Sequence, residues 1–143
     1  MSKQQQPTIN RVLVLVDATP KGGTVVLRAL NGWQNQIAEQ TVTIAPEDFI
    51  YHDAKLNGDH TKLIAIIKAM KQLVNKLPAE KKASYHLVIV HSSQNVQGWL
   101  TQTAARKADL VQEFGGYIDR LSGRFPGLQF EHRPRKVITD LMQ

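Results

Sequence analysis

An aspartate ends the most apolar run of the chain. Residues 11–17 read Arg-Val-Leu-Val-Leu-Val-Asp, and Pro20 follows shortly after. A carboxylate at the end of a buried strand can hold a divalent cation, because hard cations prefer oxygen ligands. It can also cap a turn or pair with a lysine such as Lys62. The residue types alone leave both roles open for Asp17.

Two serines follow a second apolar run, residues 85–91, which ends in His91. A nucleophilic serine needs a base and usually stands on a sharp G-x-S-x-G turn. Neither that pattern nor an ordered triad accompanies Ser92 and Ser93. We therefore predict that Ser93 or Ser92 caps the following helix. His91, at the strand end, is expected to be a satisfied side chain rather than a metal ligand.

Four potential metal ligands fall close together: His52, Asp53, Asp59 and His60. Their spacing matches no known ligand motif, so a solvated loop is the expected structure. The chain has no cysteine, which excludes disulfides and thiolate metal sites. We predict no metal ion from this loop.

Hydrophobic periodicity predicts the elements that position these residues. Strands are expected at 11–17, 24–30, 37–44, 85–91 and 128–132, and helices at 59–77, 95–105 and 108–124. Asp59 is the expected cap of the first helix. Short turns make the first three strands an antiparallel meander, whereas the fourth follows a helix and should lie parallel to the first. A short basic tail reaches Gln143.

Length and charge narrow the class of protein. The 143 residues suit one domain at 10–143 behind a flexible lead at 1–9, and 42% of them are hydrophobic, which is typical of a globular fold. No apolar signal region opens the chain and no apolar run could span a membrane, so we expect a cytoplasmic protein. The net charge of +6 favours polyanionic partners.

The order β-β-β-α-β-α-α-β, with an acid ending the first strand, resembles the ribonuclease H fold over nearly the whole chain. Asp17 lies where that family has an aspartate at the end of strand one. The Ser-Gln step after Ser92 resembles a strand-four signature in which an aspartate precedes Ser-Gln. Lys62 opens a helix segment that normally begins with a glutamate, and Asp140 falls in a segment like the final acidic one. The resemblance implies an α/β fold with a five-stranded mixed sheet, order 3-2-1-4-5, and helices on both faces.

In the ribonuclease H family, two divalent metals hydrolyse a phosphodiester, and four carboxylates hold the two metals. This chain keeps Asp17 and Asp140, but has Lys62 and Ser92 at the other two positions. Two acids and one lysine leave a single net negative charge against the four positive charges of two Mg²⁺. Asp59 is the nearest acid that could compensate. The resemblance therefore implies a degenerate site without metal or other cofactor. Lys62 could take the place of a metal there and pair with Asp17.

Basic side chains supply the second part of the functional hypothesis. Arg133, Arg135 and Lys136 lie in the tail, and Lys68 and Lys71 lie on the polar side of the helix at 59–77. Guanidinium groups suit phosphates through bidentate hydrogen bonds. We predict a non-catalytic domain that binds RNA–DNA hybrid or duplex RNA. The alternatives are an Mg²⁺- or Mn²⁺-dependent ribonuclease with a reduced carboxylate set, and a scaffold for a protein partner.

Overall fold

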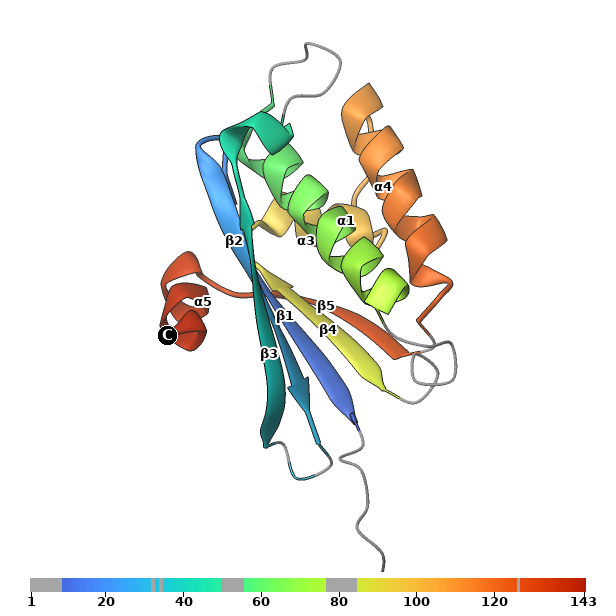
Figure 1. Cartoon of the computed structure of the whole chain (residues 1–143). Helices are drawn as coiled ribbons and strands as arrows, with labels where there is room; N and C mark the ends of the chain where they lie inside the picture. The colour runs from blue at the N-terminus through green and yellow to red at the C-terminus, as the bar shows by residue number, and fades with distance from the viewer. Residues whose placement is uncertain (1–8, 32, 34, 50–55, 77–84, 126) are drawn as a thin grey trace, which may run out of the picture.

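A five-stranded mixed sheet forms the centre of the molecule (Figure 1). The computed structural model describes residues 9–31, 33, 35–49, 56–76, 85–125 and 127–143. The strands are β1 (Arg11–Thr19), β2 (Gly22–Leu30), β3 (Gln36–Ile44), β4 (His86–His91) and β5 (Gly127–His132). Their order is β3-β2-β1-β4-β5. β1 and β2 pair antiparallel, as do β2 and β3, whereas β4 is parallel to both β1 and β5. The predicted sheet order is confirmed.

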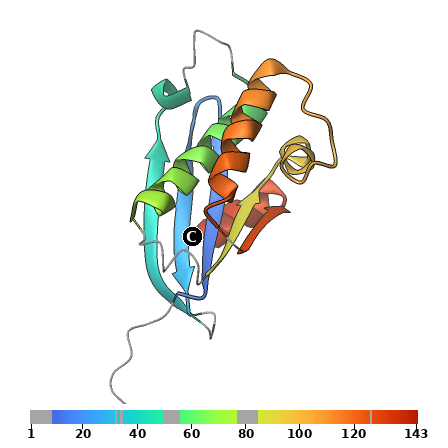
Figure 2. The ribbon, with the colours of Figure 1, turned by 90° about the vertical axis from the view of Figure 1, so that its right-hand side faces the viewer.

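Helices cover both faces of the sheet, as predicted (Figures 1 and 2). The long helices α1 (Gly58–Lys76) and α4 (Asp109–Ser122) lie on one face, and α5 (Arg135–Met142) lies on the other. The short helix α3 (Gln94–Leu100) follows β4, and a 3-10 turn, η1 (Pro46–Phe49), follows β3. None of the helices in the described ranges is long and apolar enough to cross a membrane. The predicted lead at 1–9 lies outside the described residues except for its last one.

The alternation of side chains along β1 assigns each residue to a face, because successive side chains of a strand point to opposite sides. Val12, Val14, Val16 and Ala18 belong to the core beneath α1 and α4. Leu15 belongs to the smaller core beneath α5. Asp17, two residues beyond Leu15, therefore points to the α5 face of the sheet.

A tight hairpin holds Asp17 in register. Pro20 and Lys21 form the turn between β1 and β2. β2 thus begins at Gly22, two residues earlier than predicted. Gly22 has a φ of +125°, which glycine adopts without strain. A Cβ at Gly23 would stand 2.6 Å from the Asp17 carbonyl oxygen, so only glycine allows this close approach.

Two further expectations from the sequence were wrong. The helix expected at 95–105 ends at Leu100, where the Thr101 hydroxyl donates to the Gln97 carbonyl (2.7 Å) and Gln102 adopts a φ of +62°. A side chain that bonds the preceding turn competes with continuation of the helix. The expected basic tail is also not a simple tail, because residues 135–142 form α5, docked on the sheet through the buried Ile138.

Candidate functional site

The carboxyl ends of three parallel strands meet at one edge of the sheet. β1, β4 and β5 end there, and α1, α3 and α5 begin near the same edge. In open α/β sheets, ligands often bind at such an edge because loops and helix N-termini converge on it. This topology brings Asp17, Lys62 and Ser93 toward one edge, although they are distant in sequence. We call it the carboxyl edge.

Arg135 pairs with Asp17 at the carboxyl edge. The Arg135 Nε donates to Asp17 Oδ1 at 2.8 Å, and its Nη2 donates to Oδ2 at 3.4 Å. This hydrogen bond and the charge of Asp17 raise the pKa of the guanidinium. The pair joins the first turn of α5 to the end of β1, across 118 residues of sequence.

The predicted pair between Lys62 and Asp17 was wrong. Lys62 Nζ instead donates to the carbonyl oxygens of Ala18 (3.1 Å) and Gly58 (3.4 Å). The reason is geometric: α1 lies on the face of the sheet opposite to the one to which Asp17 points. Lys62 therefore reaches the backbone of β1 but not the carboxylate of Asp17.

The cap of α1 is Asn57 rather than Asp59. The Asn57 Oδ1 accepts from the backbone N–H of His60 (2.9 Å), and His60 Nδ1 accepts from the backbone N–H of Asn57 (3.2 Å). This reciprocal arrangement is a capping box in which a histidine takes the usual glutamate's place. Asp59 is thereby free to accept from Ser93 Oγ (2.6 Å) and Asn95 Nδ2 (3.1 Å), which ties α1 to the start of α3.

Ser93 caps α3, as predicted, because its hydroxyl oxygen accepts from the backbone N–H of Val96 at 3.1 Å. His91, fully buried at the end of β4, lies directly beneath this cap. His91 Nδ1 accepts from the backbone N–H of Ser93 (3.3 Å), and Nε2 contacts Gln97 Oε1 at 2.7 Å. Gln97 in turn donates to the carbonyl of Phe130 (2.8 Å). This network requires a neutral His91 with its proton on Nε2, and burial lowers the pKa of His91 to about 4.

The other predicted remnants of an acidic site take different positions. Ser92 is half-buried between His91 and the α3 cap, and Asp140 is exposed in the last turns of α5. Among the described residues, no hydrogen bond or ion pair joins Asp140 to Asp17. Nor does any group of three or more histidine, aspartate or glutamate side chains in the described ranges form a potential metal site.

Comparison with known proteins identifies the fold. No family model matches the chain, and no curated protein matches it. Solved structures do match, including the RNase H1 of the archaeon Halobacterium salinarum, with 16% identity, a TM-score of 0.66, and 91% and 90% of the two chains covered. LC11-RNase H1, isolated from compost, matches with 14% identity, a TM-score of 0.65, and 92% and 90% covered. The same enzyme has been solved in complex with RNA/DNA hybrid, and that structure matches with 16% identity, a TM-score of 0.62, and 91% and 88% covered.

The chain has a ribonuclease H-like fold. At these levels of identity the likeness concerns the fold alone. The roles of Asp17, Asp140, Lys62 and Ser92 as remnants of a metal site stay predictions.

The predicted basic residues divide between the two faces of this ribonuclease H-like sheet. Arg133, Arg135 and Lys136 surround the β5–α5 corner at the carboxyl edge, and Arg133 lies 3.3 Å from Glu131. Lys68 and Lys71 belong to α1 on the opposite face. The two groups therefore do not form one continuous surface.

Sequence reasoning missed the aromatic partner of Lys71. Lys71 Nζ and the guanidinium carbon of Arg120 each lie 5.4 Å from the centre of the Tyr117 ring. Cations at this distance from an aromatic ring are attracted by its negative face. Only the contact between Tyr117 and Arg120 had a signal in the sequence, because these residues are three apart on α4 and share one side of that helix. The contact with Lys71 depends on how α1 packs against α4.

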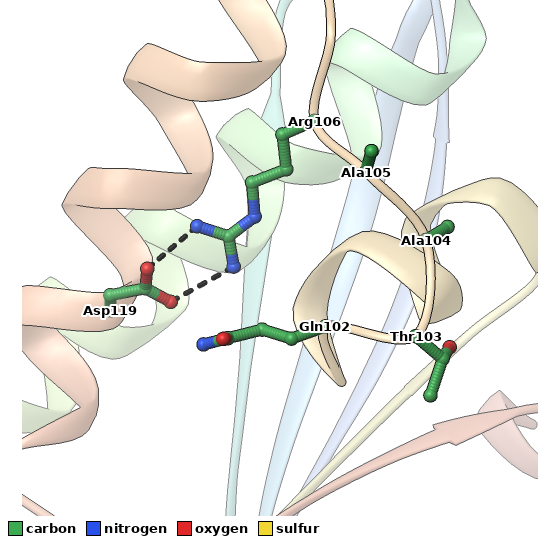
Figure 3. Close-up of a pocket in the computed structure, with 6 residues that line it drawn as sticks. All are labelled: Gln102, Thr103, Ala104, Ala105, Arg106 and Asp119. Atoms are coloured by element: carbon green, nitrogen blue, oxygen red, sulfur yellow. Dashed lines mark hydrogen bonds and ion pairs between the residues drawn. The ribbon is translucent and has the colours of Figure 1, made fainter.

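A separate hollow of about 460 Å³ lies beside the loop from α3 to α4 (Figure 3). Its lining includes Gln102, Arg106 and Asp119. The Arg106 guanidinium donates to both Asp119 oxygens (2.6 and 3.0 Å), and its Nε donates to the Trp99 carbonyl (3.0 Å). These bonds fix the loop against α4, so this arginine has a structural role.

Proposed function

We propose that this ribonuclease H-like domain binds nucleic acid through basic side chains at the carboxyl edge and does not cleave it. The observation that carries the proposal is the Arg135–Asp17 ion pair, at 2.8 Å. A two-metal site would require the carboxylate of Asp17. This carboxylate already accepts hydrogen bonds from Arg135. The edge therefore offers guanidinium groups to an anion rather than carboxylates to a metal.

The donor set at this edge does not fit two divalent metals. Mg²⁺ demands near-octahedral oxygen ligands. Asp17 is engaged by Arg135, Asp59 is engaged by Ser93 and Asn95, and Lys62 holds its ammonium group against the end of β1. The carboxylates of Asp17 and Asp59 therefore already have hydrogen-bond partners within the protein.

Charge and fold support the choice of ligand. The chain carries 18 lysines and arginines against 12 acids. One of the matching ribonuclease H structures holds an RNA/DNA hybrid. We infer the same class of ligand here, RNA–DNA hybrid or duplex RNA, held through its phosphates.

The direct test combines binding and cleavage in one experiment. Purified protein is mixed with end-labelled RNA–DNA hybrid or duplex RNA at low salt, with Mg²⁺ or Mn²⁺, and run on native and denaturing gels. We expect a retarded band whose label stays full length. The binding constant should fall with salt with a log–log slope of about −0.9 per phosphate contacted. Shortened label would establish the metal-dependent alternative, and absence of binding at low salt would favour the protein-scaffold alternative.

The two basic groups are expected to contribute unequally. Charge reversal at the β5–α5 corner, Arg133→Glu with Lys136→Glu, should weaken binding more than Lys68→Glu with Lys71→Glu, because only the first pair adjoins Asp17 and Arg135. Both double variants change the net charge equally, so each controls for the other. Fluorescence anisotropy over a salt series measures the difference. Equal losses would indicate that the charge acts only through the overall field of the protein.

A further inference from the structure

In two ion pairs of the domain, the arginine side chain is less exposed to solvent than the acidic side chain. Arg28 Nε lies 2.6 Å from Glu39, and Arg106 Nη1 lies 2.6 Å from Asp119. The side chains of these arginines are only 14% and 16% exposed, less than those of their carboxylate partners. These two guanidinium groups are therefore largely shielded from the solvent.

In the two ion pairs at the β5–α5 corner, the arginine is instead the more exposed partner. The Arg135 side chain is 62% exposed, whereas that of its partner Asp17 is 20% exposed. Arg133 is likewise 50% exposed and more accessible than its partner Glu131. The backbone N–H of Arg133 also donates to the His91 carbonyl (2.9 Å), which fixes this corner to the end of β4. Both pairs therefore present a guanidinium to the solvent at the same place.

The hydrogen bonds of Arg135 leave one side of its guanidinium available. A guanidinium has five N–H donors in a fixed plane. Asp17 accepts from Nε and from Nη2, so the Nη1 group and the second N–H of Nη2 point away from Asp17. These remaining donors match the bidentate geometry that arginine uses with phosphate oxygens.

We propose that Arg135, held in place by Asp17, binds a backbone phosphate of the nucleic acid. Asp17 thus acts as a positioning residue for a cation of the protein. The inference rests on the proposed function and names the contact that it would use. A side chain that is already ordered loses less conformational entropy on binding. An arginine held by an ion pair is therefore expected to bind a phosphate more tightly than an unrestrained arginine.

Removal of the guanidinium tests the contact. We expect Arg135→Ala to weaken binding to a fluorescent RNA–DNA hybrid roughly tenfold at low salt, because it removes a charge-assisted pair of hydrogen bonds. The magnitude of the salt slope should fall by about 1. Arg135→Lys keeps the charge but not the planar fork, so it should recover the slope and only part of the affinity.

Asp17→Asn separates positioning from simple charge. Asparagine removes a negative charge beside the ligand, so unspecific electrostatic attraction would make binding tighter. If Asp17 positions Arg135, binding instead becomes weaker, by roughly threefold to tenfold. The same substitution in an Arg135→Ala background should then weaken binding no further. Tighter binding by the single variant would overturn the positioning role.

Arg28→Ala is the matched control, because it removes the same charge and breaks an arginine–carboxylate ion pair whose arginine is shielded from the solvent. Arg28 lies opposite Leu13 of β1. Leu13 precedes Asp17 by four residues, which is about 13 Å along the strand, so Arg28 is remote from the proposed contact. Thermal unfolding by circular dichroism confirms that each variant is folded. If the parent protein binds no nucleic acid, the proposed function fails. If the parent binds and Arg135→Ala behaves like Arg28→Ala, only the phosphate contact fails.

Discussion

Acidification from pH 7 to pH 4 is expected to lower the free energy of unfolding by about 3 kcal/mol through His91 alone. His91 is fully buried at the end of β4, and burial lowers its pKa from 6.5 to about 4. The hydrogen bond with Gln97 and the charge of Asp59 oppose this shift, whereas the charges of His132 and Lys62 support it. The neutral imidazole is also the form that can accept from the Ser93 backbone N–H.

The direction of the effect follows from proton linkage. Between pH 6.5 and about 4, the unfolded chain binds a proton at His91 and the folded chain does not, so the stability falls as the pH falls. Above pH 6.5 both states are neutral, and this contribution is present in full. His60, whose pKa is also lowered by burial, acts in the same direction because its Nδ1 accepts in the cap of α1.

Urea unfolding at a series of pH values measures how the free energy of unfolding depends on pH. An NMR titration of the His91 ring protons measures the pKa of His91. His91→Gln is the control variant, because it removes the titrating group and keeps a polar side chain. It should unfold more easily at pH 7, yet lose much less stability between pH 6.5 and 4. A variant with the slope of the parent protein would assign the acid sensitivity to other groups.

The sheet order could be predicted because local patterns determine most of it. The β-branched runs at β1 and β4 are buried on both faces, and short turns join β1, β2 and β3. The helix between β3 and β4 then favours a β4 parallel to β1, because parallel strands are usually joined by a helical crossover. The Ser93 cap was predictable for the same reason, since a serine directly after a strand and before a helical pattern has few other local roles.

The partners of the acids could not be predicted from local patterns. Whether Asp17 meets Lys62 or Arg135 depends on which face of β1 each helix covers, and the alternation of β1 is equally apolar on both faces. The C-terminal residues carry a clearer signal. Pro134 precedes Val137, Ile138, Leu141 and Met142, and this spacing is typical of one side of a helix. Recognition of that helix would have placed Arg135 in its first turn and Asp140 near its C-terminal end.

Ile138→Ala is expected to lower the free energy of unfolding by about 2–5 kcal/mol, the usual range for a fully buried isoleucine. Of the residues of α5, all of which are described, only Ile138 is buried. It packs into a small core formed by Leu15, Val26, Val88 and Val90. Chemical unfolding measures the loss.

The same variant should also weaken binding to RNA–DNA hybrid, because Ile138 docks the helix whose first turn carries Arg135. Val137→Ala is the matched control: it removes apolar atoms from the adjacent, exposed residue of α5 and should change stability by less than about 0.5 kcal/mol. If both variants were equally stable, α5 would not be held by its buried side chain. If Ile138→Ala lost stability but kept full affinity, the ligand would not depend on the position of α5, and the phosphate contact of Arg135 would have to be abandoned.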